Sequence, residues 1–195
     1  MFLLIYACYA KKESIWFGAA TQDDQVVASC FSTGEPDLER LLERLPEDTA
    51  FHVTDNPNQN LIDVLQGLYE AFNGESIEVN NFKININRLS GYAQRILNCT
   101  SLIPLGYVAT YGDVAKVAGG SARSVGNVEA LNPVPLLIPC HRIVKSDFQI
   151  GGYGYGKQTK WEILQRENKS YEVSKTIKVY ENELVLFPVG SVQQG

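Results

Sequence analysis

Cysteine and histidine are both scarce in this sequence. Its 195 residues include two histidines and four cysteines, and the cysteines form no CxxC pair: Cys8, Cys30, Cys99 and Cys140. Such scattered cysteines argue against a disulfide framework and favour a reducing compartment. A zinc site needs four converging ligands, and the two histidines, His52 and His141, lie far apart. The composition therefore disfavours both a disulfide-stabilised scaffold and a zinc protein.

Long apolar runs are also absent. No segment approaches the roughly 20 apolar residues of a transmembrane helix, so no membrane association is expected. The start, MFLLIYACYAKK, has no basic residue before its short apolar stretch, which favours a buried strand over a secretory signal. With 45% hydrophobic and 20% charged residues, the composition is typical of a soluble globular protein with one large domain or two small ones.

Positive charge is scarce in the first part of the chain. Residues 1–80 contain 4 Lys and Arg against 14 Asp and Glu, whereas residues 81–195 contain 13 against 8. The net charges of these two parts are −10 and +5. This asymmetry indicates that the second part faces an anion. The alternative is a solvated acidic part beside a less charged one, and charge alone does not decide between them.

The first part has the pattern of a small α/β domain. Three β-rich runs, FLLIYACY, SIWFGAA and QVVASCF, are separated by polar turns and predict a strand meander over residues 2–31. Leucines at helical spacing predict a helix in 36–45, and AFHVT predicts a short strand at 50–54. A stronger helix is expected over 60–73, with Gly74 as its stop.

A polar stretch over residues 73–87 separates this part from the rest. We therefore expect an N-terminal α/β domain at 1–80, a linker at 81–88 and a C-terminal domain at 89–195. The C-terminal domain is expected to be mostly helical, and its tail segments TIKVY and LVLFP predict a terminal β-hairpin.

Residues 110–131 predict two helices joined by a tight turn. Thr110 and Asp113 resemble a capping box before a short helix, glycines at 119–120 end it, and Ser121 can cap a second helix. This outline is that of a helix-turn-helix, although any short helical hairpin shares it.

The second of these helices has almost no side chain along one stripe, at Ala122, Gly126 and Ala130. Close packing on the preceding helix is one explanation. Contact with a groove wall of nucleic acid is the other, and Arg123 in the first turn would then project from the exposed end of the helix.

The segment NPVPLLIPCHRIV, residues 132–144, contains the strongest candidate for chemistry. A thiol reacts as the thiolate, which needs positive charge, a base or a donor nearby. His141 follows Cys140 directly, and neighbours on a strand point to opposite faces. Proton transfer through a water, with an acid orienting the histidine, is therefore expected. The other three cysteines lie in apolar patterns and are interpreted as inert core residues. Local chemistry leaves open whether Cys140 is catalytic or structural.

Several segments resemble one family in their order and spacing. IPCHRIV resembles the active-site signature of the O6-alkylguanine-DNA alkyltransferases, which repair DNA by direct reversal, and NPVPLL, ATYGDVAKVAG, SARSVGN and IGGYGYG…KWEILQREN also match. The resemblance covers residues 90–168, and the N-terminal part matches in layout only. It implies an α/β fold: a small ribonuclease H-like domain of sheet and helices, then a mostly helical domain with a winged-helix-like helix-turn-helix.

The resemblance implies an enzyme, a methylated-DNA–protein-cysteine S-methyltransferase. Cys140 would take the alkyl group from guanine O6 irreversibly, so that each molecule reacts once. His141, through a water, would pass the thiol proton toward Glu167. Tyr111 would donate a proton to the departing guanine, and Asn132 would tie the helix-turn-helix to the Cys140 turn.

The resemblance also implies how DNA is held. The target base must be flipped out of the duplex, with Arg123 filling the gap and the second helix in the minor groove. The carbonyls of Cys140 and Ile143 would bind the guanine amino group, and Tyr153 would form a pocket wall. The residues expected to contact substrate or DNA are Thr110, Ala122, Arg123, Ser124, Gly126, Asn127, Ile143, Tyr153, Gly154 and Lys160.

The implied partner is double-stranded DNA containing O6-alkylguanine, bound by a monomer that uses no cofactor and no metal. The expected location is the cytoplasm, in association with the nucleoid, or the nucleus of a eukaryote.

The sequence departs from the family pattern at several positions. Gly154 stands where the family usually has a serine that helps to hold the guanine oxygen. Glu129 and Leu131 on the second helix should weaken phosphate binding. Arg142 is interpreted as mainly structural, and residues after 169 have no counterpart in the family.

Two other functions compete with alkyl transfer. A non-catalytic binder of alkyl lesions with the same fold would lack the cysteine, and Cys140 is intact here. A cysteine hydrolase that uses Cys140 and His141 would turn over repeatedly and leave the thiol unmodified.

Overall fold

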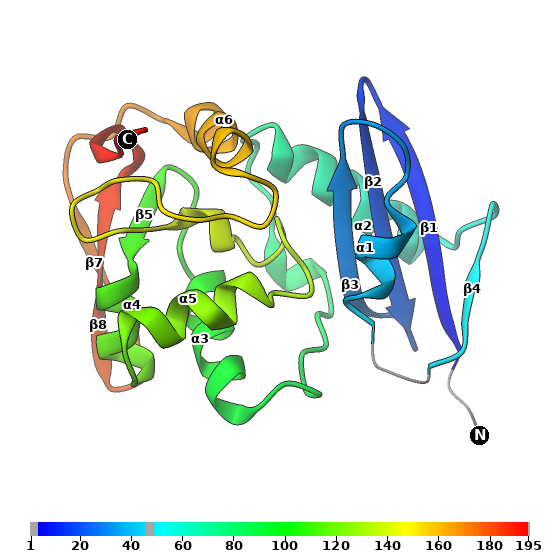
Figure 1. Cartoon of the computed structure of the whole chain (residues 1–195), viewed down its shortest axis with the longest axis horizontal. Coiled ribbons are helices and arrows are strands. Elements are labelled where there is room, and N and C mark those ends of the chain that lie inside the picture. Colours follow the sequence, from blue (N-terminus) through cyan, green and yellow to red (C-terminus); the bar gives the residue numbers. More distant parts are fainter. Residues whose placement is uncertain (1–3, 46–48, 195) are drawn as a thin grey trace. The chain divides into compact units, whose positions relative to one another are not determined.

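The structure is a computed structural model that describes residues 4–45 and 49–194 (Figure 1). The chain divides into two compact units. The first comprises the described residues up to 71 together with 77–88 and 133–137; the second comprises 72–76, 89–132 and the described residues from 138 onward. All the site residues expected from the sequence belong to the second unit. The assignment of domains at 1–80 and 89–195, with a linker at 81–88, stays a prediction.

The sheet of the first unit confirms the predicted meander. Strands β1 (Ile5–Lys12), β2 (Ile15–Gln22) and β3 (Gln25–Ser32) pair antiparallel in sequence order. The short strand β4 (Phe51–Val53) adds parallel to β1, which gives the order β3-β2-β1-β4. The first two residues of the predicted meander lie outside the described residues. Asp23 and Asp24 both have positive φ, which suits the two-residue turn between twisted antiparallel strands.

Two helices cover opposite faces of this sheet. Helix α1 (Leu38–Leu42) buries Leu41 in a cluster with residues of β1, β2 and β3. Helix α2 (Gln59–Phe72) lies on the other face, where Tyr69 packs edge-on against Phe17 of β2. The predicted helix over 36–45 was wrong in length, because α1 begins only after its cap Asp37 and ends after five residues.

The polar segment between the two helical regions is folded rather than extended. It contains a short 3-10 turn, η1 (Val79–Asn81), and Ile84 forms a parallel bridge with Val26. Residues 77–88 therefore group with the first unit.

The second unit combines helices with a small mixed sheet. Its helices are α3 (Gly91–Ser101), α4 (Tyr111–Ala118), α5 (Ala122–Ala130) and α6 (Lys157–Glu167), and 3-10 turns occur at η2 (Cys140–Arg142) and η3 (Val189–Ser191). Its strands are β5 (Tyr107–Thr110), β6 (Ile143–Val144), β7 (Lys175–Val179) and β8 (Asn182–Pro188), in the order β6-β5-β8-β7. The predicted terminal hairpin is confirmed as β7–β8, and it joins a sheet that the sequence did not predict.

The predicted pair of helices is confirmed as α4 and α5. The Thr110 hydroxyl accepts a hydrogen bond from the backbone N–H of Asp113 and caps α4, and Ser121 forms a reciprocal capping box with Ser124 at the start of α5. Gly119 and Gly120 adopt φ values of 89° and 87° between the helices, a region that residues with a side chain rarely adopt. These two glycines allow the chain to turn between α4 and α5.

In the described part of the chain, no helix is long and apolar enough to cross a bilayer.

Candidate active site

Cys140 begins the 3-10 turn η2, at the end of the buried run Leu136–Ile138. Its side chain is almost buried, and the side-chain amide of Asn132 donates a hydrogen bond to Sγ at 3.2 Å. The same nitrogen donates to the carbonyl of Ile138 at 2.8 Å. Asn132 lies two residues after the end of α5 and thus connects this end of the helix to the thiol. An N–H donor directed at sulfur favours the thiolate over the neutral thiol.

The turn changes the relation between Cys140 and His141. On a strand, these neighbouring side chains would point to opposite faces. That expectation was wrong, because Cys140–Arg142 is a helical turn. His141 is fully buried beside it, and its Nε2 lies 3.0 Å from Oε1 of Glu167 on α6.

Glu167 is the centre of a buried charge network. Arg142 donates to both of its carboxylate oxygens, from Nε to Oε2 at 2.9 Å and from Nη2 to Oε1 at 2.8 Å. The remaining Nη1 of Arg142 donates to the carbonyl of Ile103 at 2.6 Å. The interpretation of Arg142 as structural is therefore confirmed. Its guanidinium holds the carboxylate that in turn holds His141.

The pKa values of this network define the histidine tautomer. Burial by itself would raise the pKa of Glu167, but the charges and hydrogen bonds of His141 and Arg142 outweigh burial and lower this pKa to about 2. Burial lowers the pKa of His141, although Glu167 opposes that shift. An ionised Glu167 can only accept hydrogen bonds, so Nε2 of His141 carries the proton. Nδ1 is then the basic nitrogen, and it is buried without a hydrogen-bond partner among the described residues.

Tyr111 and Lys160 lie near the thiol. Burial raises the pKa of Tyr111 to about 12, with smaller contributions from Glu129 and Cys140, so its hydroxyl stays protonated at neutral pH. Lys160 is fully buried and donates to the carbonyls of Ile143 at 2.5 Å and Gly152 at 3.2 Å. Burial lowers the pKa of Lys160 to about 8, although Cys140 and Glu129 oppose the shift.

Helix α5 presents its N-terminal half to solvent. Ala122, Arg123 and Asn127 are exposed, and Ser124 is partly buried because its hydroxyl is engaged in the cap and lies 2.7 Å from the Tyr92 hydroxyl. Two members of the small-residue stripe, Ala122 and Ala130, are exposed, so close packing on the preceding helix does not explain them. Gly126 does face that helix, because a Cβ added to it would lie 3.8 Å from the Tyr111 ring of α4.

Leu131 and Glu129, two departures from the family pattern, differ in their exposure to solvent. Leu131 is 74% exposed just after α5, as expected for a residue on an open surface. Glu129 was expected to weaken phosphate binding, but it does not lie on the open surface of the helix. Its side chain is 7% exposed, and its Oε1 accepts a hydrogen bond from the Thr100 hydroxyl of α3 at 2.5 Å.

The loop between β6 and α6 forms one wall beside His141. The Tyr153 ring packs edge-on against the His141 ring, at 6.3 Å between centroids. Gly151 has φ of 73°, and a Cβ there would lie 3.2 Å from the Tyr111 ring. Gly154 is exposed, and a Cβ added to it would meet no atom within 4 Å, so the missing serine reflects no lack of space.

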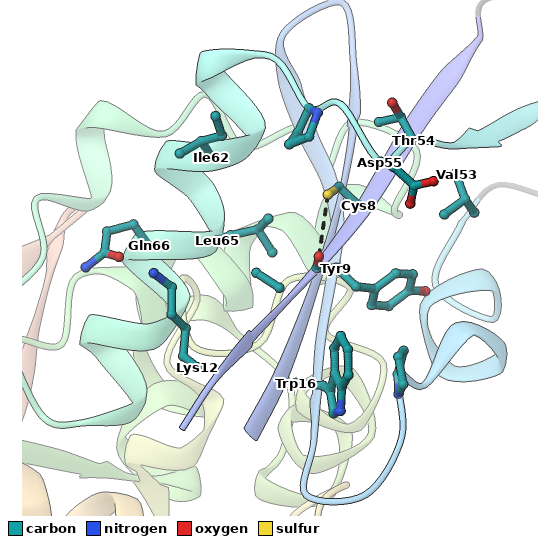
Figure 2. Close-up of a pocket in the computed structure, with 13 residues that line it drawn as sticks. Cys8, Tyr9, Lys12, Trp16, Val53, Thr54, Asp55, Ile62, Leu65 and Gln66 are labelled. Atoms are coloured by element: carbon teal, nitrogen blue, oxygen red, sulfur yellow. Dashed lines mark hydrogen bonds between the residues drawn. The ribbon is translucent and has the colours of Figure 1, made fainter. Parts of the chain in front are cut away.

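The remaining cysteines have the character expected of inert thiols. Burial raises the pKa of Cys30 and of Cys99 to about 12. Burial also raises the pKa of Cys8, which lines a cavity of about 510 Å³ within the first unit, and its thiol donates to the backbone carbonyl of Tyr9 (Figure 2). The described residues include no group of three or more His, Cys, Asp or Glu placed to hold a metal.

The family resemblance pointed to Cys140, His141 and Glu167; the structure places Cys140 and His141 in one 3-10 turn and His141 in hydrogen-bond contact with Glu167. The sequence did not reveal the direct contact of Asn132 with sulfur or the bidentate contact of Arg142 with Glu167. No local signal announces either contact, because the partners are 8 and 25 residues apart in sequence.

The chain has clear relatives. Residues 91–169 match the family described as 6-O-methylguanine DNA methyltransferase, DNA binding domain. The methylated-DNA–protein-cysteine methyltransferase of Methanocaldococcus vulcanius is 34% identical over 120 residues, which cover 59% of this chain and 72% of that protein. The enzyme of the same name from Methanothermobacter thermautotrophicus is 34% identical over 117 residues, 60% of this chain and 66% of the relative. Other curated relatives are matched over about half of their own length.

A solved structure extends the likeness across both units. Mycobacterium tuberculosis OGT in complex with DNA superimposes with a TM-score of 0.66 at 22% identity, and the match covers 83% of this chain and 92% of that one. This likeness shows a mixed α/β fold with an N-terminal sheet and a helical C-terminal region. The fold, the sequence match through the whole Cys140 region and the length of relative that it covers show that the chain belongs to the methylated-DNA–protein-cysteine methyltransferase family.

Proposed function

We propose that this protein repairs O6-alkylguanine in DNA by transferring the alkyl group to Cys140. The observation that carries the proposal is the hydrogen-bonded arrangement around one thiol. Sγ of Cys140 receives the Asn132 amide, and the next residue, His141, is held by an ionised Glu167 with its basic nitrogen unengaged. This arrangement supplies both a thiolate and an acceptor for the thiol proton.

The transfer is a displacement at the alkyl carbon. The thiol proton passes through a water to Nδ1 of His141, and Glu167 stabilises the imidazolium that forms. The thiolate then forms the S–C bond while the bond from that carbon to guanine O6 breaks. Tyr111 donates its proton to the ring of the departing guanine. The thioether is stable, so the proposed reaction is irreversible and each molecule reacts once.

The proposed DNA complex uses the exposed face of α5. The lesion is flipped into the pocket because O6 is inaccessible in a stacked duplex, Arg123 fills the gap, and α5 enters the minor groove. The carbonyls of Cys140 and Ile143 bind the guanine amino group through the lone pairs that their present partners leave unused. Thr110, Asn127 and the loop at 151–156 complete the contacts.

The proposed function also implies a more specific fold assignment, an oligomeric state and a location in the cell. We propose that the first unit is ribonuclease H-like and that α4 and α5 act as a winged-helix-like pair, with the β7–β8 hairpin in the same sheet as β5. The protein is proposed to act as a monomer in the cytoplasm at the nucleoid, or in the nucleus.

Intact-protein mass spectrometry tests the proposed function. After mixing with an equimolar duplex containing O6-methylguanine, the protein should gain one methyl group, located on Cys140 by peptide mapping, and no more with excess duplex. An unchanged mass with tight binding would instead support a lesion binder. Repeated turnover with an unmodified thiol would support a hydrolase.

Replacement of Arg123 by Ala should separate base flipping from chemistry. Arg123 is exposed near the start of α5, so its loss removes no buried contact. Repair of an O6-methylguanine duplex should slow by about 10-fold or more, since unstacking a base requires a few kcal/mol. Reaction of Cys140 with free O6-benzylguanine should be nearly unchanged, because nothing has to be flipped. Equal losses on the duplex and on the free base would contradict the assignment and would indicate that Arg123 anchors the helix instead.

A further inference from the structure

Strand β1 of the first unit has an edge that is only half covered. Strand β4 pairs with it at Ile5–Ala7 and then turns away, and the pair ends with a hydrogen bond from the N–H of Thr54 to the carbonyl of Ala7. On a strand, every second residue directs its N–H and C=O groups to the same side. The backbone groups of Tyr9 and Lys11 therefore face the side that β4 has left.

The other side of β1 supports this assignment. Its register with β2 runs without a bulge to the pair Lys12↔Ile15, which closes a two-residue turn and faces β2. Among the residues that the structure describes, the N–H groups of Tyr9 and Lys11 and the Lys11 carbonyl have no hydrogen-bond partner. The Tyr9 carbonyl accepts only a 3.6 Å contact from the Cys8 thiol, which leaves one lone pair unused (Figure 2). Four backbone groups can thus still pair along this edge.

A cavity of about 510 Å³ adjoins the free edge (Figure 2). Its walls include Cys8 of β1, Trp16 of β2, and Ile62 and Leu65 of α2. Ile62 is 45% exposed, so the apolar wall is open to solvent. Free backbone groups and an apolar cavity therefore occur together, and the volume is typical of a ligand site.

We propose that this edge and cavity bind an extended peptide segment of a partner protein, which adds to β1 as a strand where β4 leaves the edge open. A second backbone is the ligand that matches N–H and C=O groups at the spacing of Tyr9 and Lys11. The side chains of an added strand point alternately to two faces. One set would enter the cavity beside Ile62 and Leu65, and the other would lie on the side of Trp16. The partner segment is therefore extended and carries apolar side chains.

The charges of the first part of the chain favour a basic partner over a second copy. Residues 1–80 carry a net charge of −10, so two copies of this part repel each other. Lysines at a strand edge, here Lys11 and Lys12, also discourage pairing between copies. The ammonium of Lys12 lies over the Tyr69 ring at 5.9 Å, whereas Asp55 lines the cavity. A Lys or Arg of the partner segment can pair with Asp55.

The test uses the full chain and the peptide acetyl-Lys-Thr-Val-Thr-Val-Thr-Lys-amide. Binding is followed by NMR of the ¹⁵N-labelled protein. The amide signals of Tyr9 and Lys11 should shift saturably with a midpoint below about 1 mM peptide, since up to four backbone hydrogen bonds form. Hydrogen exchange of these two amides should slow in the complex. No saturable shift at these amides, or shifts centred on other residues, would overturn the proposal.

Backbone methylation of the peptide separates strand pairing from simple apolar binding. Methylation of the two Val nitrogens removes donors along one edge of the peptide strand, and methylation of two Thr nitrogens removes donors along the other. Only one edge pairs with β1, so one methylated peptide should bind about 10-fold more weakly than the other. Equal binding of both would mean that the cavity takes an apolar molecule and not a strand, and the proposal would fail.

The variant Lys11→Pro blocks the edge of the protein itself, and Lys11→Ala is its matched control. Proline is tolerated on an edge strand where the missing N–H faces solvent, so the pairing of β1 with β2 should persist. Lys11→Pro should bind the peptide about 10-fold more weakly than Lys11→Ala, which loses the same charge but keeps the N–H. Equal affinity of the two folded variants would refute pairing at Lys11. The methylated peptides decide the question on the wild type if Lys11→Pro does not fold.

Sedimentation velocity tests a second copy as the occupant. The wild type should sediment as one species whose size does not depend on the peptide. A dimer that the peptide disperses and that Lys11→Pro abolishes would assign the edge to a second copy and overturn the proposal. None of these readouts depends on alkyl transfer, so the result is independent of the proposed function.

Discussion

Replacement of Cys140 by Ser should abolish alkyl transfer and leave binding to an O6-methylguanine duplex nearly unchanged. A hydroxyl is close to a thiol in size and can accept the hydrogen bond that Asn132 gives to sulfur. Its conjugate base is not formed at neutral pH by a neighbouring imidazole alone, so the attack on the alkyl carbon is lost. The measurements are protein mass after incubation with the duplex, and duplex affinity by fluorescence anisotropy.

The matched control for this variant is Cys99→Ser. Cys99 is fully buried in α3, and burial raises its pKa to about 12, so it has no thiolate at neutral pH. The control should react at the normal rate if it folds. Retained transfer in Cys140→Ser, together with its loss in a folded Cys99→Ser, would show that Cys140 is the wrong thiol.

Replacement of Glu167 by Gln should slow transfer and also destabilise the protein. An amide has one acceptor oxygen, whereas the carboxylate accepts from His141 and twice from Arg142. The buried guanidinium would lose a charged partner, an effect of about 3–5 kcal/mol on the free energy of unfolding. Transfer by the folded fraction should slow by about 100-fold or more, because the imidazolium formed during proton transfer is no longer stabilised. Urea unfolding and single-turnover rates measure the two effects.

The pH dependence of the free energy of unfolding in acid tests the role of Glu167 a second time. The pKa of Glu167 is lowered to about 2 in the folded protein from a reference of 4.5. Its carboxylate therefore stabilises the fold above pH 4.5, and this contribution, about 3 kcal/mol, is lost as the pH falls toward 2. Glu167→Gln should lack that part of the acid dependence. The matched control is Glu162→Gln, at an exposed position on the same helix, which should change neither stability nor rate. An unchanged pH–rate profile in folded Glu167→Gln would remove Glu167 from the proton pathway.

Much of the secondary structure could be predicted from the sequence because its signals are local. Alternating apolar residues and polar turns specify β1–β3, and the caps at Thr110 and Ser121 specify the starts of α4 and α5. The short strands β5 and β6 carry no such signal. Four and two residues are too few to show a period, and only their pairing with each other and with β8 makes them strands.

The sequence likewise predicted the identity of the main site residues but not the local conformation that positions them. The segment around Cys140, with its family resemblance, identified the nucleophile, His141 and Glu167 from order and spacing. The sequence alone did not predict that Cys140–Arg142 forms a 3-10 turn. That conformation depends on buried contacts with distant residues, because His141 binds Glu167 of α6 and Arg142 donates to the carbonyl of Ile103.

The sequence by itself determined which residues carry the chemistry, since a reactive thiol and its neighbours are read from side-chain identity and order. Only the tertiary structure decided what each side chain faces. Glu129 looked like a surface charge on the helix proposed to contact DNA, yet the helix turns it toward Thr100 of α3, 29 residues earlier in the chain. The physical reason is that burial and hydrogen-bond partners depend on how distant segments pack together, and side-chain identity and order along the chain do not specify that packing.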